Sequence, residues 1–368
     1  MKITCLQENL KNNLNIVQNI VGRNLTLPIL NNLLLEIDGV RLKISSTNLE
    51  IGINSWTSGK IEKTGAITVP AKTLSSFINS LPNKKVELET KDNILSVKCE
   101  NYKANIVGLP ADDFPIIPKI KEDPCFVFKK SEILKNNLNK VIGCSAISES
   151  RPEISGVFLY FDKEIIKLAA TDSFRLAEVT THQQNSLAIK PASLIIPQRT
   201  AQELIRILGE KPNEELKIVL STNQVLFDLN DVQLISRLID GKYPDYQQII
   251  PKNTETQVVV SREEFINNIK VASIFSGKIN AVKLIIKPGK IEIAAQDVDL
   301  GENKSQLSAD VKGKNLEISF NYRYLLDGLV NISTKQVLLG MNSSFSAAII
   351  KPVGEENYIY VVMPIKNS

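Results

Sequence analysis

The chain has 368 residues, of which 43% are hydrophobic and 23% are charged, and its formal net charge at pH 7 is +4. This composition is that of an ordinary globular protein, and its single histidine, His182, argues against catalytic triads and histidine-based zinc sites. The four cysteines (Cys5, Cys99, Cys125 and Cys144) lie too far apart for a metal or redox motif, and the sequence contains no glycine-rich phosphate-binding loop.

One helix signature occurs three times along the chain. The string Leu10-Lys-Asn-Asn-Leu14 is followed 124 residues later by Leu134-Lys-Asn-Asn-Leu138, and 131 residues after that by Phe265-Ile-Asn-Asn-Ile269. In each string, apolar residues four positions apart lie on one face of the predicted helix. A period near one third of the chain is the length of a domain and far exceeds a solenoid unit of about 20 to 50 residues.

Two strand-forming runs follow each copy of the signature. They span residues 34–48, 157–172 and 284–297, and a short turn containing Asp, Gly or Lys divides each pair. A further strand then leads into a second helix in each third of the chain. The six expected helices cover residues 7–22, 71–81, 131–142, 198–209, 262–276 and 321–331.

The repeat predicts an α+β fold with three similar domains, each with two helices packed on antiparallel sheets. We expect these domains at residues 1–120, 121–250 and 251–368. The N-terminus lacks the apolar run of a signal peptide, and no later stretch approaches the ~20 apolar residues of a membrane span. We therefore expect a cytoplasmic protein with reduced cysteines and no membrane association.

The residues alone favour a binding or scaffolding role. No nucleophile with an acid–base partner is visible, which argues against an enzyme. Basic residues outnumber acidic ones by nine to six on the expected helices, so a weak, sequence-independent contact with phosphates fits better than base reading. From the repeats alone, a monomeric repeat-domain interaction scaffold without DNA stays open as the alternative.

Six short strings occur from near the N-terminus to the last residues: Thr26-Leu-Pro-Ile-Leu30, Thr68-Val-Pro-Ala-Lys72, Leu109-Pro-Ala-Asp-Asp-Phe-Pro115, Ala170-Thr-Asp-Ser-Phe-Arg-Leu-Ala177, Asp240-Gly-Lys-Tyr-Pro-Asp-Tyr246 and Tyr360-Val-Val-Met-Pro-Ile365. In order and spacing they resemble the bacterial DNA polymerase III beta subunits, the replicative sliding clamps. The resemblance implies the DNA clamp fold, with two subunits joined head to tail into a pseudo-six-fold ring around duplex DNA.

The same resemblance implies a non-catalytic processivity subunit of a DNA polymerase holoenzyme that needs no cofactor or metal. Its implied partners are double-stranded DNA of any sequence and a second copy of the chain. They also include the DNA polymerase III alpha subunit, the clamp loader complex, and other polymerases and repair proteins with short linear motifs.

Three groups of site residues follow from the resemblance. DNA contacts are expected at Arg23, Lys72, Ser148 and Arg151. The dimer interface is expected between two edge strands, where Ala104 and Ile106 face Ile274 and Phe275 of the other copy.

The third group is a pocket for partner peptides between the second and third domains. Phe174 and Gln248 stand near it where histidine and arginine are familiar in the family. We call the following set the partner pocket: Ile154, Thr171, Ser173, Arg175, Leu176, Pro244, Ile249, Tyr324, Ser344, Ser346, Val361, Val362, Met363 and Pro364. Aliphatic walls, one adaptable methionine and a polar edge suit a peptide site.

Overall fold

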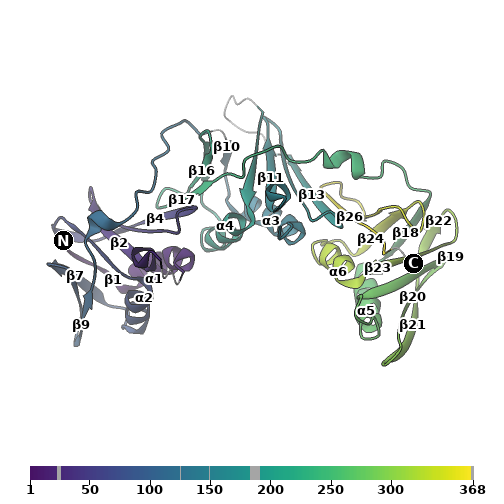
Figure 1. Ribbon diagram of the computed structural model, residues 1–368, viewed down its shortest axis with the longest axis horizontal. Helices are drawn as coiled ribbons and strands as arrows, with labels where there is room; N and C mark the ends of the chain where they lie inside the picture. The colour runs from purple at the N-terminus through teal and green to yellow at the C-terminus, as the bar shows by residue number, and fades with distance from the viewer. Residues whose placement is uncertain (23–25, 125, 149, 183–190, 366–368) are drawn as a thin grey trace. The chain divides into compact units, whose positions relative to one another are not determined.

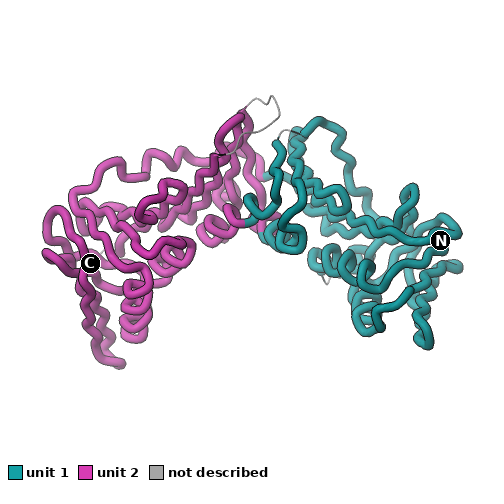
Figure 2. The backbone as a smooth tube through the Cα atoms, turned by 180° about the vertical axis from the view of Figure 1, so that it is seen from behind, with its two compact units in different colours: residues 1–135, 202–238 teal, residues 136–201, 239–368 magenta. Residues whose placement is uncertain are grey.

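The computed structural model describes residues 1–22, 26–124, 126–148, 150–182 and 191–365, and its elements are labelled in Figure 1. The chain forms two compact units. Unit 1 holds residues 1–135 and 202–238, and unit 2 holds residues 136–201 and 239–368 (Figure 2). The middle third of the chain therefore contributes to both units, and the division into three domains at residues 120 and 250 stays a prediction.

Six α-helices form in the described residues, within a few residues of the predicted ranges. They are α1 (Gln7–Val17), α2 (Ala71–Ser80), α3 (Glu132–Val141), α4 (Gln198–Glu210), α5 (Arg262–Ser273) and α6 (Tyr322–Val330). The largest difference is at α1, where the last turns of the predicted range become a 3-10 helix at Gln18–Ile20. The other short 3-10 helices are Pro28–Asn31, Ala111–Asp113, Ile142–Cys144, Pro152–Ile154 and Tyr246–Ile249.

Unit 1 contains two sheets whose strands all pair antiparallel. The five-stranded sheet has the order β5 (Lys60–Lys63), β1 (Lys2–Leu6), β7 (Lys85–Lys91), β8 (Ile94–Cys99) and β9 (Tyr102–Val107). The eight-stranded sheet has the order β10 (Phe126–Phe128), β15 (Leu216–Leu220), β16 (Gln224–Asp228), β17 (Val232–Arg237), β4 (Ile51–Ser58), β3 (Arg41–Thr47), β2 (Asn32–Asp38) and β6 (Ala66–Pro70).

Unit 2 repeats this plan with two further antiparallel sheets. The nine-stranded sheet has the order β14 (Ala192–Pro197), β11 (Gly156–Phe161), β12 (Ile165–Thr171), β13 (Arg175–His182), β26 (Tyr358–Val362), β25 (Ala348–Pro352), β24 (Gln336–Met341), β18 (Thr256–Ser261) and β22 (Asp310–Lys312). The four-stranded sheet has the order β21 (Gly301–Ser308), β20 (Lys290–Asp297), β19 (Ala281–Lys287) and β23 (Leu316–Asn321).

The predicted hairpins form as β2–β3, β11–β12 and β19–β20. Gly39 and Gly289 lie in the turns of two of these hairpins. Their φ angles are 59° and 75°, a left-handed conformation that glycine adopts without steric cost because it has no Cβ. The repeated helix signature lies in α1, α3 and α5, and its terminal apolar residues (Leu10, Leu14, Leu134, Leu138, Phe265 and Ile269) are at most 1% exposed. The helices thus cover the sheets with the predicted face.

The cysteines behave as core residues where the structure describes them. Cys5, Cys99 and Cys144 are free and buried, and burial raises the pKa of the Cys5 and Cys144 thiols to about 12. Cys125 lies outside the described residues. Among the described residues there is no cluster of three or more His, Cys, Asp or Glu that could hold a metal, and no helix is long and apolar enough to cross a membrane.

Candidate functional site

The turn between β12 and β13 places four of the predicted partner-pocket residues. Thr171 Oγ1 donates to the carbonyl of Arg175 at 2.7 Å and accepts from the backbone N–H of Ser173 at 3.2 Å. Asp172 Oδ1 accepts from the backbone N–H groups of Phe174 and Arg175 at 2.9 and 3.0 Å. Ser173 adopts a φ of 77°, which these side-chain hydrogen bonds hold in place.

The guanidinium group of Arg175 ties this turn to the rest of unit 2. Its Nε donates to Asp172 Oδ2 at 3.0 Å, one terminal nitrogen donates to the carbonyl of Gly143 at 2.7 Å, and the other donates to Asp327 on α6. The group also lies 4.6 Å from the ring centre of Tyr324. With its side chain only 13% exposed, Arg175 is a structural anchor as well as a candidate contact.

An apolar wall stands beside the turn, where β13 pairs with β26. Leu176 is opposite Val361 and Arg175 is opposite Val362, and the backbone N–H of Met363 donates to the carbonyl of Phe174 at 2.8 Å. Val361 and Leu176 are almost fully buried, whereas the Met363 side chain is 38% exposed. Met363 is therefore the member of this wall that a ligand can reach most directly.

The remaining pocket residues come from four other segments of unit 2, one of which is α6 with Tyr324. Ser344 and Ser346 are in the loop between β24 and β25, and Pro244 and Ile249 are in the segment that leads to β18. Pro364 is buried directly after Met363, and Ile154 is 2% exposed in its 3-10 helix. One buried cluster contains two of the apolar pocket residues, Leu176 and Val361, together with Ala169, Ile195, Tyr243, Tyr246 and Ile349, and Ile250 packs against it.

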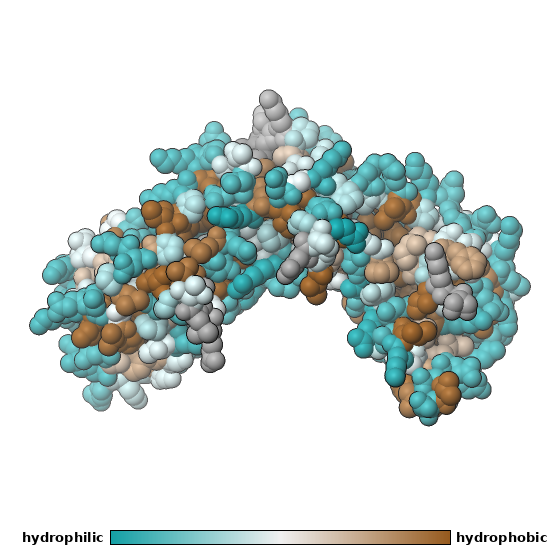
Figure 3. All heavy atoms as spheres, viewed as in Figure 1, coloured by the Kyte–Doolittle hydropathy of each residue, from teal (hydrophilic) through white to brown (hydrophobic). Residues whose placement is uncertain are grey.

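Two exposed aromatic rings add to this picture. Phe174 is 59% exposed and stacks on Tyr324 with the ring centres 6.5 Å apart, and Phe345, between Ser344 and Ser346, is 63% exposed. Phe345 was not among the predicted residues, although a phenylalanine within a run of serines is a recognisable signal of a ring on a polar loop. Figure 3 shows that hydrophobic side chains form several small groups among hydrophilic ones on the face it displays.

The predicted DNA contacts are distributed over both units. Lys72 is exposed in the first turn of α2 in unit 1. In unit 2, Ser148 Oγ accepts from the backbone N–H of Arg151 at 3.3 Å, so these two residues share one turn, and Arg151 is exposed. Arg23 lies outside the described residues. The side chains of Lys72 and Arg151 are thus available to solvent, while the Ser148 hydroxyl helps to hold its own loop.

The predicted dimer contacts lie in two segments of the chain, and the interface itself stays a prediction. β9 does end its sheet in the described part of the chain, as predicted, and Ala104 is half-buried there, but Ile106 is only 5% exposed because its side chain points into the core. Ile274 (65% exposed) and Phe275 follow the end of α5 and do not lie on an edge strand. The four-stranded sheet of unit 2, whose strand β21 contacts α5, ends in β21 on one side and β23 on the other, so pairing between two edge strands would involve one of these two strands.

Comparison with known proteins gives the same family for every third of the chain. Family models of the DNA polymerase III beta subunit match residues 1–118 (N-terminal domain), 130–245 (central domain) and 247–366 (C-terminal domain). Among curated proteins, the beta sliding clamp of Pseudomonas aeruginosa is 30% identical, and that of Bacillus subtilis is 28% identical, with each alignment covering 100% of both chains.

Solved structures agree with this family match. The DNA polymerase III subunit beta of Pseudomonas aeruginosa has a TM-score of 0.94 at 29% identity, and that of Thermotoga maritima has 0.93 at 26%, each covering 100% of both chains. The three-domain clamp fold expected from the sequence is therefore confirmed. The chain belongs to the DNA polymerase III beta subunit family, the beta sliding clamps.

Proposed function

We propose that this DNA sliding clamp acts as a head-to-tail dimer that closes around duplex DNA and tethers the replicative polymerase. The observation that carries the proposal is the full-length likeness to sliding clamps, in a chain whose sequence repeats one domain plan three times. Two copies of three domains supply six similar segments, which suits a closed ring with protected sheet edges.

The proposal assigns the domains to residues 1–120, 121–250 and 251–368, and the DNA contacts to Arg23, Lys72, Ser148 and Arg151. Retention on DNA then comes from closure of the ring, so these contacts can be few and independent of base sequence. The exposure of Lys72 and Arg151 supports contact with phosphate oxygens.

The partner pocket is the proposed docking point for short linear motifs. We assign to it the DNA polymerase III alpha subunit, the clamp loader complex, and other polymerases and repair proteins, all acting in the cytoplasm. The exposed apolar side chains of Met363 and Ile249 support this assignment, since they can enter a groove contact with a peptide.

The proposed dimer is tested by the mass of the protein in solution. We expect twice the chain mass for the wild type in analytical ultracentrifugation, and the monomer mass for Ile274→Ala/Phe275→Ala. The matched control is Val330→Ala, which also truncates an exposed apolar residue next to a helix end of unit 2. A wild type that sediments as a monomer across the micromolar range would instead favour the scaffold without DNA encirclement.

A further inference from the structure

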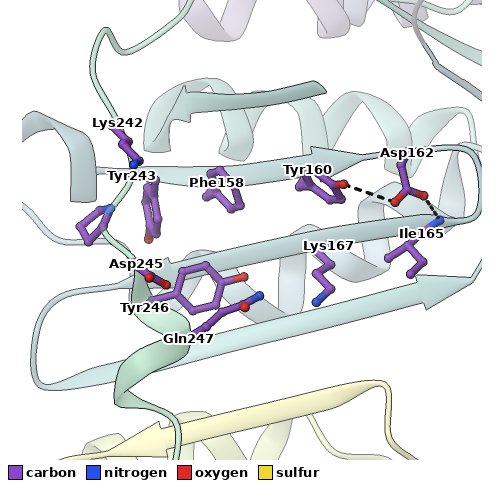
Figure 4. A pocket seen from close by; sticks show the side chains of 11 residues that line it. Phe158, Tyr160, Asp162, Ile165, Lys167, Lys242, Tyr243, Asp245, Tyr246 and Gln247 are labelled. Atoms are coloured by element: carbon purple, nitrogen blue, oxygen red, sulfur yellow. Dashed lines mark hydrogen bonds between the residues drawn. The ribbon is translucent and has the colours of Figure 1, made fainter. Parts of the chain in front are cut away.

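The hairpin β11–β12 carries a hollow of about 480 Å³, which we call the sheet hollow (Figure 4). Val157, Leu159 and Phe161 are fully buried on one face of β11, and the side chains between them therefore project from the opposite face. The hollow lies on that opposite face. Its lining residues are Phe158, Tyr160, Asp162, Ile165, Lys167, Lys242, Tyr243, Pro244, Asp245, Tyr246 and Gln247.

Aromatic rings form the apolar part of the sheet hollow. Phe158 stacks on Tyr243 with ring centres 5.0 Å apart and meets the edge of Tyr246 at 6.1 Å. The Tyr246 hydroxyl is already used, because it donates to Glu178 Oε2 at 2.6 Å. Figure 4 shows Tyr160 further along β11, with Lys167 beside it on β12. These contacts fix the positions of the rings, so a large apolar side chain of a ligand can pack against them.

Two carboxylates and two lysines line the sheet hollow, so its formal charge is zero, and the two kinds of group differ in their partners within the chain. Asp162 Oδ1 accepts from the backbone N–H groups of Glu164 and Ile165, each at 2.8 Å, and Tyr160 donates to Oδ2 at 3.3 Å. Asp245 Oδ2 accepts from Gln248 Nε2 at 2.7 Å. Both carboxylates thus accept hydrogen bonds from other groups of the chain. Among the described residues, by contrast, the two lining lysines, 167 and 242, make no side-chain hydrogen bond or ion pair.

The sheet hollow and the partner pocket share Pro244 and are lined by neighbours in one buried cluster. Tyr243 and Tyr246 belong to the same buried cluster as Leu176 and Val361, and Phe158 packs against this cluster. The segment that carries these two tyrosines therefore forms a wall of the hollow on one side and supports the apolar wall of the pocket on the other. Pro244 is a predicted member of the pocket and also lines the hollow.

We propose that the sheet hollow binds an acidic stretch of the same partner protein whose apolar residues occupy the partner pocket. One large apolar side chain of this stretch packs over Phe158 and Tyr160, and its carboxylates pair with Lys167 and Lys242. This inference rests on the proposed function, because it extends the peptide site named there. The charge contacts add specificity and a faster association, which high salt suppresses.

The test compares full-length clamps for binding to the immobilised DNA polymerase III alpha subunit of the same organism at low and high salt. The hollow variant is Lys167→Glu/Lys242→Glu. Its control, Lys163→Glu/Lys335→Glu, reverses two exposed lysines outside the hollow and changes the net charge equally. Met363→Glu is the pocket variant, since it places a charge on an exposed side chain of the partner pocket.

We expect the hollow variant to bind about ten-fold more weakly at low salt, with a smaller loss at high salt, and the control to stay within about two-fold of the wild type. Met363→Glu should reduce binding at both salt concentrations. If the hollow variant binds like its control while Met363→Glu is impaired, the sheet-hollow proposal is overturned and the partner pocket stands. Full binding by Met363→Glu as well would overturn both.

Discussion

The turn at residues 47–52 in unit 1 and the turn at residues 171–176 in unit 2 have similar backbone conformations and different side chains. Leu49 and Ser173 adopt φ of 76° and 77°. The N–H of Arg237 donates to the carbonyl of Glu50 at 3.0 Å, just as the N–H of Met363 donates to that of Phe174 at 2.8 Å. Each turn is followed by a strand pair of the same register, Gly52 with Ile235 and Leu176 with Val361.

The side chains give the two turns different surroundings. A Cβ added at Gly52 would lie 2.7 Å from Ile117 Cγ2, so the chain's own Ile117 fills the space beside this strand, leaving a hollow of about 240 Å³ nearby. At the second turn, Leu176 is present and Arg175 replaces Ile51. The comparison indicates that the same turn conformation occurs twice in the chain, and that the side chains of the two turns differ around the second turn, where the proposed partner pocket lies.

The largest effect is expected from Arg175→Ala, which removes the anchor that the first turn lacks. It leaves Asp172, the carbonyl of Gly143 and the Tyr324 ring without their cation, and we expect unit 2 to lose about 3 kcal/mol of local stability. Hydrogen exchange of β13 and β26 amides measures this loss. Arg237→Ala, an exposed arginine beside the first turn, is the control, with about 0.5 kcal/mol or less. Unchanged exchange in Arg175→Ala would contradict the anchoring role.

The next effect is expected from Gly52→Leu, which gives the first turn the side chain of the second. The clash with Ile117 should cost about 1 to 3 kcal/mol through overpacking. Urea unfolding followed by the fluorescence of Trp56, the single tryptophan, which lies on β4 in unit 1, measures it. Adding Ile117→Ala should restore part of the loss, because it empties the same space. Simple additivity of the two changes would show that Ile117 does not fill the space at Gly52.

A smaller and equal effect is expected from Thr47→Val and Thr171→Val. Thr47 Oγ1 donates to the carbonyl of Ile51 at 3.0 Å and accepts from the N–H of Leu49 at 3.0 Å, which repeats the bonds of Thr171. Each substitution should cost about 1 kcal/mol in its own unit. Hydrogen exchange of the two turns, measured in both variants, checks the equality. If the losses of stability differ by more than about twofold, the threonine hydrogen bonds contribute unequally to the conformation of the two turns.

The smallest effect on stability, but a clear one on binding, is expected from Met363→Ala compared with Arg237→Ala. The backbone N–H groups of both residues donate to the equivalent carbonyl of their turn, and Met363 alone belongs to the proposed partner pocket. Loss of its side chain should weaken binding of the polymerase alpha subunit by about five- to ten-fold, with unchanged stability. Titration of both clamps into labelled alpha subunit measures this. Equal weakening by Arg237→Ala would place a second peptide site at the first turn.

The sequence predicted the local elements well because they depend on neighbouring residues. The spacing of Leu10 and Leu14 located α1, and the turn residues near Gly39 and Gly289 located two hairpins. The contacts of Arg175 with Asp327 and Gly143 join residues 152 and 32 positions apart, and no local pattern encodes them. The burial of Ile106 is likewise not readable from a local pattern, since it depends on how its strand faces the core.

The strand pairings that join distant parts of the chain into the large sheets could not be predicted from local sequence patterns either. β4 pairs with β17 and β13 pairs with β26, although some 180 residues separate the partners in each case. Family resemblance supplied the residues of the partner pocket, and the structure supplied the reason why several of them lie together. The sheet hollow required the three-dimensional structure, because free volume is a property of the folded chain.

The central claim is that the ring holds DNA by enclosing it. The most direct measurement loads the protein onto a nicked circular plasmid with a clamp loader and ATP, linearises half of the loaded sample with a restriction enzyme, and separates bound from free protein by gel filtration. The account predicts that the protein stays on the circle and slides off the linear DNA. Equal retention on both forms of the loaded sample would mean a direct grip on DNA and would contradict the encircling clamp.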